Sequence, residues 1–206
     1  VMINGPDQIF VERKGKLLRT GAMVGVRNSI RNSVVRGQMH RALWLNDPDC
    51  LMLRRKGTKL SAAQRRTQIN AIALTGGLLL YSDDFSELNS DTLSEISEIQ
   101  TIAGECFAGR LIPLDMMSRE LPQIVFNTAG YLGVFNMARK KTTVRIDADY
   151  LIRQAAAVAE IWGHRSSGQR RFVEVWDGRE IELRGEVAEV GPLGAYESLL
   201  FRQVAS

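Results

Sequence analysis

The chain has 206 residues, of which 45% are hydrophobic and 24% are charged, a composition typical of one large globular domain or two small ones. It contains no apolar run of the ~20 residues that a membrane-spanning helix needs, so we expect no membrane partner. The start, "VMINGPDQ", lacks the charged segment of a signal peptide, and a chain that begins on Val within an apolar run looks like the inner part of a longer protein.

The net charge is +4, and many of the arginines lie between Arg13 and Arg66. Such a surface could bind phosphate groups or nucleic acid. No aromatic residues interleave with these arginines, however, and no nucleic-acid-binding motif is present. We therefore expect solvated helix faces whose cations pair with nearby acids, and no nucleic-acid partner.

The cysteines and histidines do not form a recognisable metal or catalytic pattern. Cys50 and Cys106 lack the spacing of metal ligands, as do His40 and His164. We expect no metal and no cofactor. Two cysteines also make a disulfide framework improbable, which favours a reducing compartment and a cytoplasmic location.

Residues 1–106 alternate short apolar runs with helical patterns. In chain order, the expected elements are a strand at 1–4, a helix at 22–37, a strand at 42–46, a helix at 61–74, a strand at 78–82 and a helix at 93–103. Ser61 and Gln64 form the capping box of the second helix, and Gly76 closes it. Ser90 or Asp91 is expected to cap the third. This order predicts parallel strands joined by helical crossovers, an α/β architecture.

Residues 107–206 have a different pattern. Short strands are expected in "QIVFNT", "LGVFNMA", "TTVRID", "RFVEVW", "EIELRG" and "SLLFRQV", with turns between them such as Asp177–Gly178. Many short strands with glycine-rich turns predict an antiparallel sandwich. Residues 150–162 fit either a helix or a strand. We therefore expect two domains, at 1–106 and 107–206.

Acidic residues follow each expected strand of the first half. Asp7 follows the first, Asp47 and Asp49 follow the second, and Asp83 and Asp84 follow the third. Reacting groups collect at the carboxyl edge of parallel sheets and barrels, so these carboxylates are candidates for a site. They fit either an oxygen-ligand metal site or glycoside hydrolysis, in which one carboxyl acts as acid/base and another as nucleophile.

Several segments resemble one enzyme family. "RNSVVRGQMHRALWLNDPDCLMLR" (31–54) resembles the segment around the seventh barrel strand of family 36 glycoside hydrolases, the microbial α-galactosidases. "GPD" (5–7) resembles the segment after their sixth strand, and "LLLYSDDFSEL" (78–88) their eighth. The second half, with "VEVWDGREIEL" and "GPLGAYESLLFR", resembles their C-terminal sandwich. The resemblance implies the C-terminal part, about three βα units, of a (β/α)8 TIM barrel followed by an antiparallel β-sandwich.

The resemblance also implies roles for particular residues. Enzymes of this family retain anomeric configuration, and Asp7 matches their general acid/base. Asp49 and Cys50 match positions that line the sugar pocket, where a carboxylate accepts hydrogen bonds from hydroxyl groups. Asp47 is expected to order the loop, and Trp44 to pack in the core as part of its strand. The implied ligand is an α-galactoside or a related oligosaccharide.

Two departures from the family pattern limit this inference. The family's nucleophile, an Asp after the fourth strand, would lie upstream of residue 1, and Ile3 occupies the position of an Arg that holds the sugar in many relatives. We therefore expect the isolated chain to lack hydrolase activity and to need the N-terminal part of the same enzyme. The alternatives are a relative acting on another α-glycoside, a galactosyl transferase, a non-catalytic carbohydrate-binding remnant, or a metal site at Asp7, Asp49 and Asp83. Whether the chain forms a homo-oligomer is left open.

Overall fold

A computed structural model describes residues 2–4, 9–13, 16–19, 26–162, 170–183 and 187–204. Asp7 and the rest of the "GPD" segment lie outside these ranges. Within them, no helix combines the length and the hydrophobicity that crossing a membrane requires.

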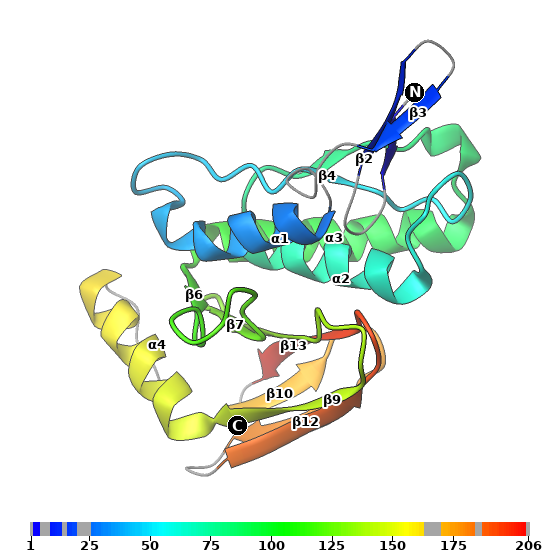
Figure 1. Ribbon diagram of the computed structural model, residues 1–206. Coiled ribbons are helices and arrows are strands. Elements are labelled where there is room, and N and C mark those ends of the chain that lie inside the picture. Colours follow the sequence, from blue (N-terminus) through cyan, green and yellow to red (C-terminus); the bar gives the residue numbers. More distant parts are fainter. Residues whose placement is uncertain are drawn as a thin grey trace.

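The first strands form a small antiparallel sheet. β1 (Met2–Asn4) pairs with β2 (Ile9–Arg13), which pairs with β3 (Lys16–Arg19). Figure 1 shows this sheet projecting from one end of the helices. The expected strand at 1–4 therefore exists, but its expected place in a parallel sheet is wrong. Only two residues separate β2 from β3, which is the spacing of a hairpin rather than of a crossover helix.

Three helices follow. They are α1 (Val26–Val35), α2 (Ala62–Thr75) and α3 (Ser90–Ala108), with short 3-10 turns at η2 (Gly37–Met39) and η3 (Phe85–Glu87). The predicted capping box of Ser61 and Gln64 is confirmed, and Gly76 ends α2 with a φ of 60°. The predicted cap of α3 is wrong. Asn89, one residue earlier, accepts the hydrogen bond from the Thr92 amide.

A short parallel pair lies against these helices. β4 (Cys50–Leu51) pairs with β5 (Leu80–Tyr81), and α2 is the crossover between them. The predicted strand at 42–46 is wrong, because residues 41–43 form a turn in which the Arg41 amide donates to the Trp44 carbonyl. Trp44 is 45% exposed rather than packed in the core. The described residues thus contain one βαβ unit, and the expected barrel is not shown.

The second half forms two antiparallel sheets, as predicted. The larger sheet has the order β11-β10-β13-β8-β7-β6 and the smaller consists of β12 and β9. The bounds are β6 (Leu111–Pro113), β7 (Ile124–Asn127), β8 (Tyr131–Phe135), β9 (Thr142–Asp147), β10 (Arg170–Glu174), β11 (Glu180–Leu183), β12 (Val187–Leu193) and β13 (Ser198–Val204). All six expected strands are present. β6 and β12 were not expected, since each contains a proline, which weakens a strand signal.

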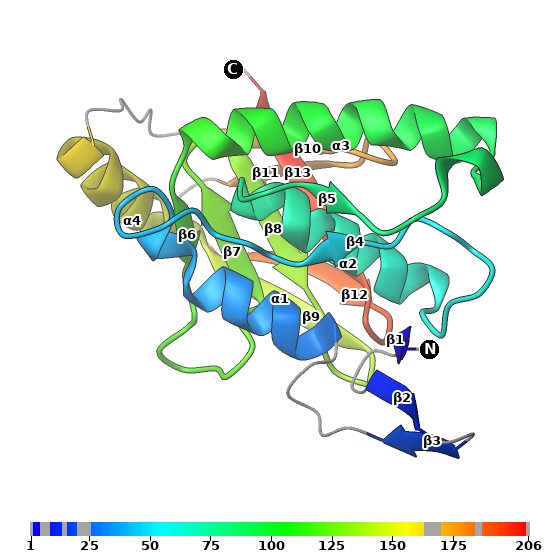
Figure 2. The ribbon, with the colours of Figure 1, turned by 90° about the horizontal axis from the view of Figure 1, so that it is seen from above.

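The segment whose sequence fitted either a helix or a strand is helical, α4 (Ala148–Trp162). In Figure 1, α4 lies at one side of the two sheets, while α1, α2 and α3 form a layer above them. Figure 2, turned by 90°, shows α1, α2 and α3 lying over the larger sheet, with β4 and β5 near the viewer.

The larger sheet has a hydrophobic core on each face. Tyr131 and Phe135 belong to the cluster shared with the helices, whereas Leu132 and Val134 belong to the cluster shared with the smaller sheet. This alternation follows from the two-residue period of a strand. Gly133 has a role in this packing, because a Cβ atom there would lie 2.6 Å from Leu74 Cδ2. The glycine therefore allows α2 to approach the sheet closely.

A buried amide joins the helices to the sheet. Asn127, which is 1% exposed, donates from Nδ2 to the carbonyl oxygens of Leu74 (2.9 Å) and Cys106 (3.1 Å). Its Oδ1 accepts from the Ala129 amide at 3.0 Å. One side chain thus bonds to carbonyl groups at the C-terminal ends of both α2 and α3. The Cys106 carbonyl also accepts from the amide of Gly109, which caps α3.

We predict that Asn127→Ala lowers the free energy of unfolding by at least about 2 kcal/mol, because it leaves the Leu74 carbonyl and the Ala129 amide without their partner in the interior and removes one of the two bonds of the Cys106 carbonyl. Urea unfolding followed by circular dichroism measures this loss. Gln100→Ala, which removes an exposed amide from α3, is the matched control and should change the stability by less than about 0.5 kcal/mol. Equal effects of the two substitutions would contradict the role given to Asn127.

Candidate functional site

The two faces of α1 differ sharply in chemistry. Val26, Ile30 and Val34 are buried against the core. Ser29, Asn32 and Ser33 lie along another side of the same helix, toward the segment 46–49, and Arg36, directly after the helix, continues their spacing of three and four residues. This polar row is the first part of a candidate site.

A cavity of about 250 Å³ opens between α1 and this segment. Its lining residues are Ser29, Asn32, Ser33, Arg36, Asn46, Asp47 and Asp49. They comprise two carboxylates, one guanidinium, two amides and two hydroxyl groups. Hydrogen-bond donors and acceptors of this kind suit a ligand rich in hydroxyl groups, since each hydroxyl both donates and accepts.

Asn46 fixes the position of the loop. It is 4% exposed, and three of its polar groups bond to three different segments. Its amide N–H donates to His40 Nδ1 (2.9 Å), its Nδ2 donates to the Ser33 carbonyl (3.1 Å), and its carbonyl accepts from the Leu78 amide (2.9 Å). Gly77 permits the last contact, because a Cβ atom there would lie 2.4 Å from the Asn46 oxygen.

The loop after Asn46 is held by its own carboxylates. Asp47 Oδ1 accepts from the Asp49 amide at 3.0 Å, in keeping with the expected role of Asp47 in ordering the loop. Asp49 has a φ of 78°, an uncommon conformation for a residue other than glycine. Its Oδ1 accepts from the Cys50 amide at 2.7 Å, and Ser29 Oγ lies 3.4 Å from its Oδ2. The carboxylate of Asp49 is therefore presented to the cavity in a fixed orientation.

Cys50, the other expected pocket residue, is not among the side chains that line this cavity. Burial, with smaller contributions from Asp49 and Asp47, raises the pKa of its thiol. The side chain is thus held in the thiol form, which is a poor nucleophile. Its carbonyl oxygen accepts a hydrogen bond from Gln68 Nε2 at 3.0 Å, which joins β4 to α2.

The remaining acids lie elsewhere. Asp83 follows β5 as expected, but its side chain is fully buried, where it accepts from the amides of Leu53 (2.6 Å) and Arg54 (3.2 Å) and pairs with the Arg54 guanidinium at 2.9 Å. Asp84 accepts from the amide (2.9 Å) and hydroxyl (2.6 Å) of Ser86, which lower its pKa. Both are structural carboxylates.

The expected gathering of acids at one sheet edge is therefore not observed. Asp47 and Asp49 precede β4, whereas Asp83 follows β5, and these are opposite ends of two parallel strands. Asp7 lies outside the described residues. Within the parts of the chain that are described, no three His, Cys, Asp or Glu side chains gather closely enough to hold a metal ion.

His40 supports the loop from beneath. It is 3% exposed, its ring meets Phe107 edge to face at 5.5 Å, and its Nε2 makes no hydrogen bond to any residue that the structure describes. Burial lowers the pKa of His40, and the nearby cations of Arg41 and Arg110 lower it further, while the Gly76 backbone opposes them. The neutral ring can accept from the Asn46 amide through Nδ1, whereas the protonated ring cannot.

The polar row of α1, Asn46 and His40 were not recognised from the sequence. The row had a signal, because Ser29, Asn32, Ser33 and Arg36 recur with the helical period. Asn46 and His40 had none, since their importance comes from contacts between segments that only the folded chain brings together.

No protein-family model matches the chain. Among solved structures, α-galactosidase I from Mortierella vinacea matches 93% of this chain with a TM-score of 0.58 at 14% identity. A GH27 β-L-arabinopyranosidase from Geobacillus stearothermophilus, in complex with arabinose, matches 87% with a TM-score of 0.59 at 14% identity. An α-galactosidase from Saccharomyces cerevisiae with raffinose matches 90% with a TM-score of 0.57 at 11% identity.

These neighbours are glycoside hydrolases. At such low identity the match shows a shared fold, and its extent over this chain includes both the helical layer and the antiparallel sheets. The chain spans only part of these enzymes, 47% of the Mortierella vinacea enzyme, 42% of the Geobacillus stearothermophilus enzyme and 52% of the Saccharomyces cerevisiae enzyme.

We predict that His40 makes the fold sensitive to acid. Because its pKa is lower in the folded than in the unfolded chain, its contribution to stability is complete above the ordinary value of 6.5 and is lost as the pH falls through the folded value. One such group changes the unfolding free energy by up to about 1.4 kcal/mol per pH unit. Urea unfolding between pH 7 and pH 5 measures the slope.

His40→Gln should reduce this slope, because the Gln carbonyl can accept from Asn46 without titrating. His164→Gln removes the other histidine of the chain and is the matched control. If His40→Gln retained the slope of the parent chain, the proposed effect of protonating His40 would be wrong.

Proposed function

We propose that this chain is part of a retaining glycoside hydrolase that acts on a terminal α-galactoside or a related oligosaccharide. The observation that carries the proposal is the cavity between α1 and the loop 46–49, which presents Asp49, Arg36 and several amide and hydroxyl groups. This cavity is suited to sugar hydroxyls, and it occurs in a fold that the chain shares with glycoside hydrolases.

In this proposal Asp49 binds the sugar. Its backbone conformation and its bonds to Cys50 and Ser29 fix the carboxylate before a ligand arrives. A preorganised carboxylate loses little conformational freedom on binding, and its hydrogen bonds to hydroxyls are charge-assisted. Arg36 supplies donors in the same cavity.

Asp7 is the proposed general acid/base, on the strength of the "GPD" resemblance. A retaining mechanism needs a second carboxyl about 5–5.5 Å from the first. Asp83 and Asp84 are occupied by structural hydrogen bonds, and Asp47 orders the loop. We therefore propose that the nucleophile comes from additional polypeptide.

The parallel pair supports this need for more polypeptide. Leu79 and Tyr81 of the β5 region pack inward, whereas Leu78 and Leu80 are each 45% exposed. Leu45 on the neighbouring loop is exposed as well. Two strands of two residues each are too short to be stable alone, and in the described part of the chain neither pairs with a further strand. Further parallel strands would cover this apolar surface and extend the sheet.

Two other functions remain as alternatives. The arabinopyranosidase neighbour shows that this fold also serves enzymes named for other sugars, which favours keeping another α-glycoside, or galactosyl transfer, as the reaction. Because Asp47, Asp83 and Asp84 are held by structural hydrogen bonds, a carbohydrate-binding part without catalysis is the second alternative. All three share the sugar pocket at Asp49.

We predict that Asp49→Ala weakens binding of raffinose or methyl α-galactoside to this chain by about 10-fold or more, since a hydrogen bond to a charged group contributes about 1.5–3 kcal/mol. Isothermal titration calorimetry measures the dissociation constant. Asp84→Ala, which removes an exposed acid away from the cavity, is the control and should leave it unchanged. Equal affinities for Asp49→Ala and the parent chain would remove the support for a sugar pocket here.

We also predict that the 206-residue chain alone does not hydrolyse an aryl α-galactoside faster than the uncatalysed reaction in buffer. Added polypeptide that carries the missing strands and a carboxylate nucleophile should restore hydrolysis. In that assembly, Asp7→Ala should reduce turnover of methyl α-galactoside by a much larger factor than turnover of a dinitrophenyl galactoside, whose leaving group needs no proton. Robust hydrolysis by the chain alone would show that no further strand is required.

A further inference from the structure

The loop between β4 and α2 concentrates positive charge. Residues 54–60 read "RRKGTKL" and contain Arg54, Arg55, Lys56 and Lys59 without an acidic residue. We refer to residues 54–60 as the basic loop. Nothing in the cavity at Asp49 uses it, since none of its side chains lines that cavity.

Both ends of the basic loop are fixed. At its start, the buried Asp83 carboxylate holds the amide and the guanidinium of Arg54. At its end, the Thr58 hydroxyl accepts from the Leu60 amide at 3.2 Å, and the capping box of Ser61 begins α2. The side chains between these anchors are exposed. The fixed ends of the loop therefore limit where its charged side chains can lie.

Most arginines near this loop are paired, as the sequence predicted. Arg54 pairs with Asp83, while Arg65 and Arg66 share Glu95 at 3.4 and 2.7 Å. In contrast, Arg55, Lys56 and Lys59 form no ion pair with any of the described residues. Asp83 and Glu95 are already engaged by Arg54, Arg65 and Arg66, and the three other cations remain available to a ligand.

The positive charge of the basic loop continues into the first turns of α2, where Arg55 lies close enough to Arg65 for their charges to interact. Burial lowers the pKa of Arg65, and although Glu95 opposes this effect, the neighbouring cations of Arg55 and Arg66 lower it further. Like charges held close together repel, and an anion bound among them would relieve the repulsion.

The basic loop follows β4 at its carboxyl end, whereas the proposed sugar pocket at Asp49 lies at the amino end of the same strand. Because β4 is short, the two remain close along the chain. Arg55 lies six positions after Asp49 in the chain, so at about 3.3 Å per residue the two are at most about 20 Å apart. An extended oligosaccharide could contact both.

We propose that the basic loop binds a negatively charged group, a carboxylate or a sulfate, on an acidic oligosaccharide. This inference rests on the proposed function in taking a carbohydrate as the carrier of the charge. Three cations with no aromatic side chain among them fit a few anionic groups on a sugar chain. Nucleic-acid binding surfaces use more phosphate contacts and often stack bases on aromatic rings.

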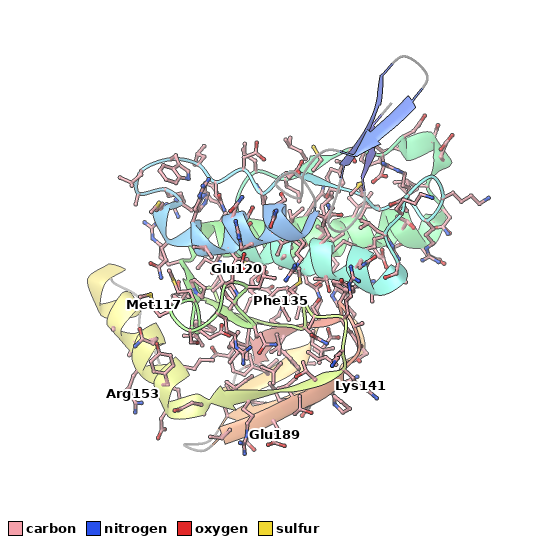
Figure 3. All side chains as sticks on the ribbon, in the orientation of Figure 1. Met117, Glu120, Phe135, Lys141, Arg153 and Glu189 are labelled. Atoms are coloured by element: carbon pink, nitrogen blue, oxygen red, sulfur yellow. The ribbon has the colours of Figure 1, made fainter. Side chains whose placement is uncertain are left out.

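The test compares two variants that lose the same charge. Arg55→Ser/Lys56→Ser/Lys59→Ser removes the free cations of the basic loop, and Lys140→Ser/Lys141→Ser/Arg153→Ser removes three exposed cations elsewhere. Figure 3 shows Lys141 and Arg153 beside the antiparallel sheets and α4, below the helical layer. Circular dichroism and urea unfolding establish that both variants are folded.

Binding of an oligogalacturonate and of a neutral galacto-oligosaccharide of equal length is then measured by calorimetry at low salt. We expect the loop variant to bind the oligogalacturonate at least about 10-fold more weakly than the parent chain, with a shallower dependence on salt. The control variant should bind it as the parent does, and neither variant should change binding of the neutral sugar. Equal loss in both variants, or no loss in the loop variant, would overturn the proposal.

Two further measurements separate the explanations. A DNA duplex that binds the parent chain as tightly as the oligogalacturonate, and loses affinity in the loop variant, would overturn the assignment to a carbohydrate. Asp49→Ala tests the pocket independently. If the oligogalacturonate binds this variant as well as it binds the parent and still requires the basic loop, the loop is supported and the sugar pocket of the proposed function fails.

Discussion

The arrangement of the candidate site depends on the burial of one amide residue, Asn46. A buried polar residue must satisfy its hydrogen-bonding groups, and Asn46 does so by bonding to the 3-10 turn region at His40, to α1 at Ser33 and to the approach to β5 at Leu78. These contacts fix the position and direction of the backbone as it enters Asp47. The direction of the loop, and therefore the orientation of the Asp49 carboxylate, follows from this requirement rather than from any property of the acids themselves.

A second constraint comes from the larger sheet, which is covered on both faces. Its strand β8 directs Tyr131 and Phe135 toward the helices and Leu132 and Val134 toward the smaller sheet. The helical layer therefore shares its core with the antiparallel half of the chain. The sequence changes character near residue 106, but the hydrophobic cluster around α2 and α3 continues across that point. The helix α1, which lines the proposed pocket, is therefore held in place by a core that residues of the second half help to form.

The sequence predicted elements where local chemistry determines the structure. The capping box at Ser61 and the strand Thr142–Asp147 have the predicted form, because capping and alternation act over a few residues. The strand at 42–46 failed because the turn at Arg41 and the contacts of Asn46 override an apolar run. The placement of the acids failed for the same reason. Asp49 could be named as a candidate from its motif, and its role stays a prediction, but its neighbours on α1 could be found only once the loop and the helix were brought together.

The surroundings of Asn127 restrict which side chain can occupy this position. The carbonyl ends of α2 and α3 both point at its Nδ2, so the negative ends of two helix dipoles converge on one buried point. An amide meets this field with its partially positive hydrogens. An aspartate of nearly the same shape would bring a negative charge to it and lose the donors. Spontaneous deamidation of this one residue would therefore replace attraction by repulsion between the sheet and the ends of both helices, although the side chain would keep almost the same volume.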